Sequence, residues 1–190
     1  MKNYVIIGNG VAAAGCIEGI RTADKDAKIT LISEEKYPVY CRPLISYYLD
    51  GKTTLEKMNY RDKNFYKDNN CDVIYGKKAV SIDKNTKTVT LDDQTKISYD
   101  SLCLATGSSA FVPPFEGLEK VENKLSFMTI DDTLALEKSL TSESKVLIVG
   151  AGLIGLKCAE GILNRVKEIT VCDLANRVLS SILDDECAAV

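Results

Sequence analysis

The chain opens with Tyr4-Val5-Ile6-Ile7-Gly8-Asn9-Gly10-Val11-Ala12-Ala13: a short apolar run, a glycine-rich turn and the start of a helical pattern. The same arrangement returns in Lys145-Val146-Leu147-Ile148-Val149-Gly150-Ala151-Gly152-Leu153-Ile154-Gly155. Between strand and helix, the first glycine makes the turn and the second lets the backbone approach a pyrophosphate. The third position needs a small residue so that helix and strand pack closely. N–H groups at the positive end of each helix then bind the phosphates, so the sequence predicts two dinucleotide sites.

Each glycine turn is followed, about 20 residues later, by an acid at the position where a carboxylate would accept hydrogen bonds from a ribose. After the first turn, the predicted strand Lys28–Ser33 ends at Glu34 and Glu35, and position favours Glu34 for this role, although Glu35 is an alternative. After the second turn, the predicted strand Glu168–Cys172 ends at Asp173. Each unit is therefore predicted to contain, in chain order, a strand, a glycine turn, a helix, a second strand and an acid.

The remaining elements follow from apolar periodicity and from turn residues. We expect an irregular segment at 37–46, where two prolines disfavour helix, and a buried strand over Asp100–Thr106. Asp131 or Asp132 is expected to cap a helix that ends near Leu140. The other expected elements are helices at 11–21, 61–69 and 153–163, and β segments at 71–75, 78–83, 88–91 and 96–98.

These elements predict an α/β fold with two Rossmann-like dinucleotide-binding domains. The first spans residues 1–112 and carries a small antiparallel β insertion at about 71–98. The second spans residues 113–190, after a linker at Pro113-Pro114 and Gly117. A doubly wound domain normally has more strands than the second one offers. We therefore expect a C-terminal remainder to be missing, with a minimal protein as the alternative.

Composition excludes several classes of function. The 190 residues carry a net charge of −3 and no long basic block, which argues against nucleic acid, and no apolar run approaches the roughly 20 residues needed to cross a membrane. The predicted strand near Met1 leaves no room for a signal peptide. Seven cysteines without a C-x-x-C pattern indicate a reduced, cytoplasmic chain. The absence of histidine removes histidine-based metal sites and Ser-His or Cys-His catalysis, and we predict no metal.

With these motifs in place, the chain resembles the N-terminal half of the pyridine nucleotide-disulfide oxidoreductase superfamily. The resemblance is closest to the branch that holds NADH:rubredoxin reductases and the flavin module of nitrite reductase large subunits. It covers essentially the whole chain and rests on four pieces in order. These are Gly8–Ala13 with Glu34, Tyr40-Cys41-Arg42-Pro43, Ala105-Thr106-Gly107, and Gly150–Gly155 with Asp173.

The resemblance implies a flavoenzyme in which hydride passes from the nicotinamide C4 of NAD(P)H to the flavin N5 of FAD. Electrons then pass to a rubredoxin, another small redox protein or a small molecule. It also implies that the NAD domain is inserted into the FAD domain, and it allows a homodimer in the full-length protein. The implied FAD residues are Gly8, Asn9, Gly10, Ala12, Ala13, Glu34, Arg42, Pro43, Val80 (through its backbone), Ala105, Thr106 and Gly107. The implied NAD residues are Gly150, Gly152, Leu153, Ile154, Gly155 and Asp173.

The chain departs from the family pattern at three places. The C-x-x-x-x-C motif of glutathione-reductase-like members is absent, which excludes a dithiol relay of that type. Tyr47 stands where ferredoxin reductases often have a lysine near the flavin. Lys157 stands where many members have a glutamate, so no role is transferred to it.

Two readings of Cys41 stay open. A neighbouring cation, Arg42, favours a thiolate, and NADH oxidases, NADH peroxidases and coenzyme A-disulfide reductases have a single redox cysteine in this region. In the other reading Cys41 only fills a small space. A third alternative is a non-catalytic FAD-binding fragment or redox sensor.

Asp173 favours NADH, because a carboxylate repels a 2′-phosphate, while the nearby Arg177 counts against this preference.

Overall fold

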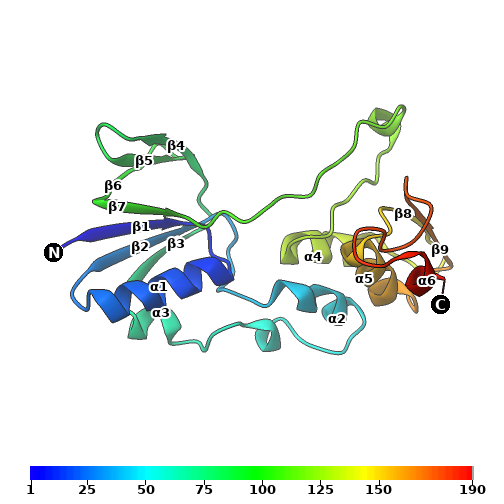
Figure 1. Ribbon diagram of the computed structural model, residues 1–190, viewed down its shortest axis with the longest axis horizontal. Coiled ribbons are helices and arrows are strands. Elements are labelled where there is room, and N and C mark those ends of the chain that lie inside the picture. The colour runs from blue at the N-terminus through cyan, green and yellow to red at the C-terminus, as the bar shows by residue number, and fades with distance from the viewer. Residues whose placement is uncertain (190) are drawn as a thin grey trace. The chain divides into compact units, whose positions relative to one another are not determined.

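The computed structural model describes residues 1–189, which form two compact units (Figure 1). The first unit consists of Met1–Cys41 and Asn59–Ser108, and the second consists of Arg42–Met58 and the chain from Ser109 onward. The second division lies close to the boundary predicted near residue 112. The segment Arg42–Met58, however, belongs to the second unit although it falls within the range predicted for the first domain. The assignment of the two units to FAD and NAD stays a prediction.

The first unit contains a four-stranded parallel sheet in the order β3-β2-β1-β7. Helix α1 connects β1 to β2, and the short helix α3 precedes β3. The mixed α/β architecture with Rossmann-like strand order confirms the predicted fold class. The elements are β1 (Asn3–Ile7), α1 (Val11–Ala23), β2 (Lys28–Ser33), α3 (Phe65–Asp68), β3 (Cys71–Tyr75) and β7 (Ser101–Leu104).

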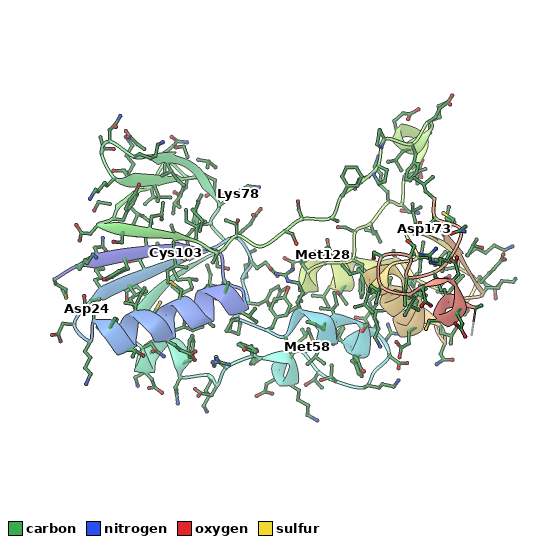
Figure 2. All side chains as sticks on the ribbon, viewed as in Figure 1. Asp24, Met58, Lys78, Cys103, Met128 and Asp173 are labelled. Atoms are coloured by element: carbon green, nitrogen blue, oxygen red, sulfur yellow. The ribbon has the colours of Figure 1, made fainter. Side chains whose placement is uncertain are left out.

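Side chains on the two faces of this sheet form two separate cores, because successive strand residues point to opposite faces. On β1, Ile6 packs with Ala13 and Ile17 of α1 on the helical face, which Cys103 also contacts (Figure 2). Val5 and Ile7 pack on the other face, against Val89 and Leu91. Figure 1 shows α1 and α3 on one side of the sheet and the antiparallel strands on the other.

The antiparallel strands form a three-stranded sheet in the order β4-β5-β6. They are β4 (Ala79–Asp83), β5 (Thr88–Leu91) and β6 (Lys96–Ser98). The structure differs from the predicted insertion at 71–98, because β3 pairs in parallel with β2 and belongs to the larger sheet. The long connection between β2 and β3, which ends in the short helix α3, returns the chain to the end of the sheet where β2 begins, as a parallel pairing requires.

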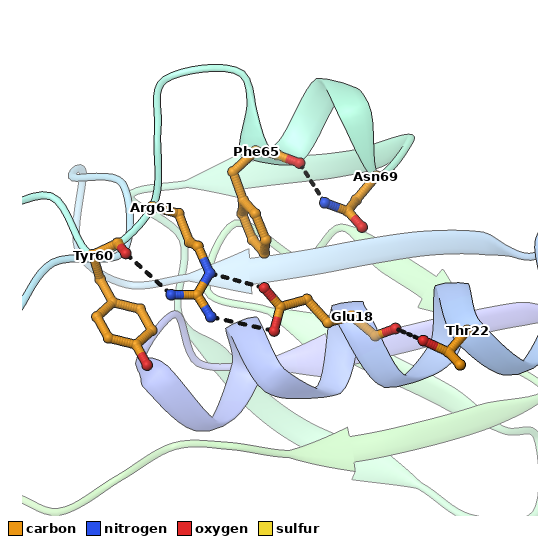
Figure 3. Close-up of polar contacts among 6 residues, drawn as sticks. All are labelled: Glu18, Thr22, Tyr60, Arg61, Phe65 and Asn69. Carbon is orange, nitrogen blue, oxygen red and sulfur yellow. Dashed lines mark hydrogen bonds and ion pairs between the residues drawn. The ribbon is translucent and has the colours of Figure 1, made fainter.

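A clamp on the outside of α1 holds the segment that re-enters the first unit. Arg61 donates to both carboxylate oxygens of Glu18, at 2.8 and 3.2 Å, and its guanidinium stacks on the Tyr60 ring at 4.2 Å (Figure 3). Hydrogen bonds to the Asp62 carbonyl and carboxylate form tight local turns just after it. The helix predicted from Arg61 is therefore shorter and begins only at Phe65.

The second unit is built on two parallel strands, with helices packed on one face. Leu49 of α2, Leu136 of α4 and Ile162 of α5 form its buried core over the inward residues of both strands. The elements are α2 (Ile45–Leu49), α4 (Ile130–Ser139), β8 (Lys145–Val149), α5 (Leu153–Ile162), β9 (Glu168–Cys172) and α6 (Asp185–Ala188), with 3₁₀ turns at Arg42–Leu44, Glu56–Met58 and Leu118–Lys120.

The N-cap of helix α4 lies two or three residues earlier than predicted. Thr129 is its N-cap and accepts a hydrogen bond from Asp132 N–H, while the Asp132 carboxylate accepts from Thr129 N–H. This is a capping box, in which the acid occupies the third helical position and the hydroxyl residue caps. The prediction that Asp131 or Asp132 is the cap was therefore wrong, since Asp132 is the reciprocal partner.

The strand that was expected to be buried over Asp100–Thr106 is shorter and less buried than predicted. β7 is only half-buried, with Leu104 63% exposed, because it is the edge strand of the described sheet. On β8, Leu147 and Val149 point away from the helices and are 63% and 50% exposed. Among the described residues, no helix has the length and apolar character needed to cross a membrane.

Candidate dinucleotide-binding sites

The first glycine turn lies where three strands of the parallel sheet end. Gly8 N–H donates to the Ile32 carbonyl at 2.9 Å, and Ala105 N–H donates to the Ile7 carbonyl at 2.8 Å. Gly8 has φ +104°, and a Cβ on it would overlap the Ala105 carbonyl oxygen and lie 2.6 Å from the carbonyl carbon. Two of the predicted FAD segments, far apart in sequence, thus meet at the sheet's switch point between β1 and β7. Thr106 and Gly107 follow directly and are exposed.

The N-terminus of α1 is open. Gly10 is its N-cap, with no side-chain hydrogen bond to the first turn and no acid in that turn. A Cβ on Gly10 would meet nothing within 4 Å, whereas Ala13 is fully buried against the sheet. Helix α4, in contrast, has a complete capping box. The first-turn N–H groups of α1 are therefore available to an anionic ligand, which fits a pyrophosphate.

The side chain of Asn9 anchors this turn. Its amide donates to the Tyr37 carbonyl at 3.0 Å and its oxygen accepts from the Tyr66 hydroxyl at 2.7 Å. The Tyr66 oxygen in turn accepts from Val39 N–H at 2.9 Å. Sequence reasoning missed Tyr66, because nothing in its local pattern indicates a contact with a turn 57 residues away.

The acids after β2 have different partners. Glu34 is exposed and lies 3.2 Å from Lys78 Nζ, whereas Glu35 accepts a hydrogen bond from the Tyr40 hydroxyl at 2.6 Å. Glu34 is therefore the more accessible carboxylate, which supports it as the ribose partner. The contact between Lys78 and Glu34 was not anticipated from the sequence.

Val80 lies at an irregularity in β4. Ala79 pairs with Leu91 and Ser81 pairs with the next residue, Thr90, so Val80 is the extra residue of a β-bulge. The extra residue of a bulge is left out of the ladder. Binding of an adenine by the Val80 backbone stays a prediction.

The motif around Arg42 spans the division between the two units. Cys41 is the last residue of its segment in the first unit and is a half-buried free thiol. Arg42 begins the second unit, where its guanidinium donates to the Met128 carbonyl at 2.7 Å, and Pro43 lies in the adjoining 3₁₀ turn. The placement of Arg42 and Pro43 beside a flavin stays a prediction.

The second glycine turn is closely packed at its third glycine, Gly155, and not at its first, Gly150. Gly150 has φ +111° and donates its N–H to the Cys172 carbonyl at 2.8 Å. A Cβ on Gly155 would overlap the Gly150 carbonyl oxygen and lie 3.3 Å from an Ile148 methyl group. Gly152 caps α5 without a side-chain bond, and the first-turn residues Leu153 and Ile154 are exposed. This helix N-terminus is also open to an anion.

Asp173 holds the second turn through its backbone. Its carboxylate accepts hydrogen bonds from Ala175 N–H at 2.8 Å and from Ala151 N–H at 2.7 Å. These bonds stabilise the charged form and hold the pKa of Asp173 below its usual range. The Ala151 carbonyl also accepts from Leu179 N–H at 2.9 Å.

Arg177 does not reach toward the second turn. It donates to the Asp185 carboxylate at 2.7 Å and to the Leu183 and Ser180 carbonyls at 3.1 and 3.3 Å. The guanidinium is thus committed to the loop that follows β9.

The two residues that depart from the family pattern in the second unit lie together. Lys157 Nζ lies 5.1 Å from the centre of the Tyr47 ring and 2.5 Å from a Glu160 carboxylate oxygen. A cation–π contact thus joins the positions where the pattern has a lysine and a glutamate.

Of the other cysteines, Cys16, Cys71 and Cys158 have the character of core residues, whereas Cys172 and Cys187 are exposed and do not fill a core. Burial raises the pKa of Cys71 to about 12 and the pKa values of Cys16 and Cys158 to about 11. A thiol that stays protonated is a poor nucleophile. Within residues 1–189, no group of three or more potential metal ligands comes together.

Comparison with known proteins agrees with this geometry. Residues 2–190 match the family model of pyridine nucleotide-disulphide oxidoreductases. The chain is 34% identical over 184 residues to a nitrite reductase [NAD(P)H] of Bacillus subtilis, covering 96% of the chain and 23% of that protein. It is 31% identical over 194 residues to an NADH oxidase of Methanocaldococcus jannaschii, covering 98% of the chain and 43% of that protein.

Among solved structures, the NADH:rubredoxin oxidoreductase from Clostridium acetobutylicum superposes with a TM-score of 0.84 at 27% identity. That match covers 99% of the chain and 48% of the solved one. The chain thus spans less than half the length of each of these proteins.

The relatives confirm the predicted resemblance and the predicted pair of cofactors, since proteins of this family are oxidoreductases that bind FAD and NAD(P)H. The chain has two glycine turns, and the helix after each begins without a side-chain cap. The chain belongs to the pyridine nucleotide-disulphide oxidoreductase family.

Proposed function

We propose that this chain forms the FAD-binding and NAD(P)H-binding part of an oxidoreductase that transfers electrons from NAD(P)H to an acceptor. The observation that carries the proposal is the pair of glycine turns whose helices begin without a side-chain cap. Helix termini normally satisfy their first N–H groups with side chains, water or ligands, and a dinucleotide pyrophosphate supplies the acceptors that these two lack.

In the first unit, the chain's contribution is to bind and orient FAD. The open N-terminus of α1 would hold the pyrophosphate, Glu34 would accept from the ribose, and the bulge at Val80 would offer backbone groups to the adenine. Bound FAD supplies the two-electron chemistry, accepting hydride from the reduced nicotinamide and releasing electrons to the acceptor. The protein then needs no acid or base side chain for the transfer, which agrees with a chain without histidine.

In the second unit, we infer a preference for NADH over NADPH. The charged Asp173 carboxylate would accept from a ribose diol and repel a 2′-phosphate. Arg177, the nearby residue that would favour NADPH, is committed to Asp185 and to two carbonyls.

For the acceptor, we infer a small redox protein such as a rubredoxin. Support comes from the structural similarity to an NADH:rubredoxin oxidoreductase. The seven free cysteines support a reducing, cytoplasmic location.

An absorbance spectrum of the purified full-length gene product, before and after anaerobic NADH, tests the proposal. We expect a flavin spectrum that bleaches on addition of NADH and less readily on addition of NADPH. A colourless protein that takes up no added FAD would contradict the FAD site. A flavin that NADH does not bleach would instead favour a binding protein or redox sensor.

The second candidate function uses Cys41 as a redox thiol that reduces oxygen, peroxide or a small disulfide. It is favoured by the half-buried free thiol of Cys41 and by the similarity to an NADH oxidase. If it holds, iodoacetamide should abolish turnover while NADH still bleaches the flavin. Turnover that survives complete alkylation of Cys41 would leave electron transfer to a redox protein as the better account.

A further inference from the structure

We propose that Tyr66 is a positioning residue for FAD and that it acts through Asn9. This inference rests on the proposed function, because it assumes that the first glycine turn binds the FAD pyrophosphate. Tyr66 lies on α3, outside every motif in the sequence, and its hydroxyl is 2.7 Å from the Asn9 side-chain oxygen.

The direction of each hydrogen bond in this network is fixed. Val39 N–H can only donate, so the Tyr66 oxygen accepts from it at 2.9 Å and the Tyr66 proton is directed elsewhere. That proton is donated to the Asn9 oxygen. The Asn9 NH₂ group faces the Tyr37 carbonyl, which can only accept, at 3.0 Å. The Tyr66 hydroxyl and the Tyr37 carbonyl thus hold the two ends of the Asn9 amide in one orientation.

The turn needs such an anchor because Asn9 lies between two glycines. Gly8 has φ +104°, and Gly10 is the N-cap of α1 with extended backbone angles. Glycine loses more conformational freedom on folding than any other residue, and a ligand that must order a loose turn binds less tightly. With Asn9 held at both ends of its amide, the N–H groups after Gly10 are placed before the ligand arrives.

Tyr66 itself is rigid enough to perform this task. Its ring packs edge-on against Phe65, with centroids 5.2 Å apart, and against Tyr75 at 6.4 Å, and it contacts the core under α1. Burial raises the pKa of the Tyr66 phenol, so it remains a hydrogen-bond donor at neutral pH.

A double-mutant cycle on the full-length gene product tests the inference, with FAD affinity measured by quenching of flavin fluorescence on binding to protein stripped of flavin. The variants are Tyr66→Phe, which keeps the ring and removes the hydroxyl, Asn9→Ala, and the double variant. We expect each single variant to weaken FAD binding about tenfold, and the double variant to bind no more weakly than Asn9→Ala alone. Tyr48→Phe is the matched control, because it removes a hydroxyl bonded to Glu137 at 3.3 Å in the second unit.

The readouts separate this inference from a structural role and from the proposed function. Unchanged FAD affinity in Tyr66→Phe would overturn it, and so would effects of the two single variants that multiply to about a hundredfold. NADH affinity should not change in any variant, whereas general destabilisation would lower both affinities and would also overturn it. Wild-type protein that binds no FAD would contradict the proposed function itself.

Discussion

The two glycine turns of this chain share their spacing but differ in the way they are held. In the first turn, the middle residue is Asn9, whose neutral side chain is anchored by Tyr37 and Tyr66. In the second turn, the middle residue is Ala151, whose backbone N–H is bound by the Asp173 carboxylate. One anchor is a neutral amide that does not titrate, and the other is an ionised acid.

This difference shows that the glycine pattern specifies a backbone path but not its support. Alanine has no polar side chain, so a turn with Ala151 must be held through its main chain. The acid that follows the second strand is in reach to do this, and at the same time it is the predicted ribose partner. At the first turn the two tasks are divided, since Glu34 contacts Lys78 and Asn9 holds the turn.

The largest effect is expected from Gly8→Ala. The substitution places a Cβ against the Ala105 carbonyl at φ +104°, where L-residues are strained. We expect the free energy of unfolding to fall by about 3 kcal/mol, from backbone strain and overpacking together. Urea unfolding followed by circular dichroism measures this change.

Gly10→Ala is the matched control for Gly8→Ala. A Cβ on Gly10 would meet nothing within 4 Å and its φ is −97°, so stability should hardly change while FAD binding weakens. Equal destabilisation by the two variants would contradict the distinction between a glycine needed for packing and one needed for ligand approach.

The next effect concerns the helix after the second turn. Gly161→Ala would place a Cβ 2.8 Å from the Ser46 carbonyl oxygen and 3.2 Å from the Leu49 Cβ, where α5 crosses α2. Backbone cannot move aside as a flexible side chain can, so we expect a loss of about 1–3 kcal/mol. Thermal unfolding of the variant checks this value, and an unchanged or higher melting temperature would show that the crossing can relax.

Much of the fold could be predicted because its signals are local. The strands Lys28–Ser33 and Glu168–Cys172 were predicted with their observed bounds, since apolar runs end at acids or turns. The burial of β7 and β8 could not be predicted, because it depends on which faces are covered. The same holds for the helix cap at Thr129, where two neighbouring acids obscured the hydroxyl residue.

Residues of the candidate sites could be proposed from the sequence only where they belong to a short motif or directly follow a strand. The glycines and the acids after each strand were found in this way. Tyr66, the contact of Lys78 with Glu34 and the bulge at Val80 depend on long-range packing and strand register. No pattern in a single sequence reports such contacts.

A smaller effect is expected from Asp173→Asn, which should weaken the binding of the nucleotide at the second turn and leave binding at the first turn unchanged. The amide removes the charge that strengthens the hydrogen bonds from Ala175 and Ala151 and that repels a 2′-phosphate. We expect NADH binding to weaken about tenfold and FAD binding to stay unchanged. Titrations with each nucleotide measure this, and an equal loss of both affinities would show that Asp173 supports the whole protein.

Lowering the pH should also affect the second turn and not the first. The folded-state pKa of Asp173 is lowered, so its stabilisation is present above the usual value of 3.8 and is lost as pH falls through the folded value. The Asn9–Tyr66 bond carries no charge in this range. The amide signal of Ala151 in NMR spectra should therefore titrate below pH 3.8, while that of Gly10 should not follow the same transition. A shared midpoint for both amides would mean that one global transition controls both turns.

The smallest effect is a gain in stability from Gly19→Ala. Gly19 lies on the exposed side of α1, and a Cβ there would meet nothing within 4 Å, unlike Gly161 of α5. Alanine restricts the unfolded chain and favours helix, so we expect about 0.5–1 kcal/mol of stabilisation. A glycine-to-alanine substitution should thus raise the free energy of unfolding in α1 and lower it in α5, the two helices that follow the glycine turns. Unfolding curves for Gly19→Ala and Gly161→Ala measured side by side test this, and destabilisation by both would mean that α1 has a packing partner at Gly19.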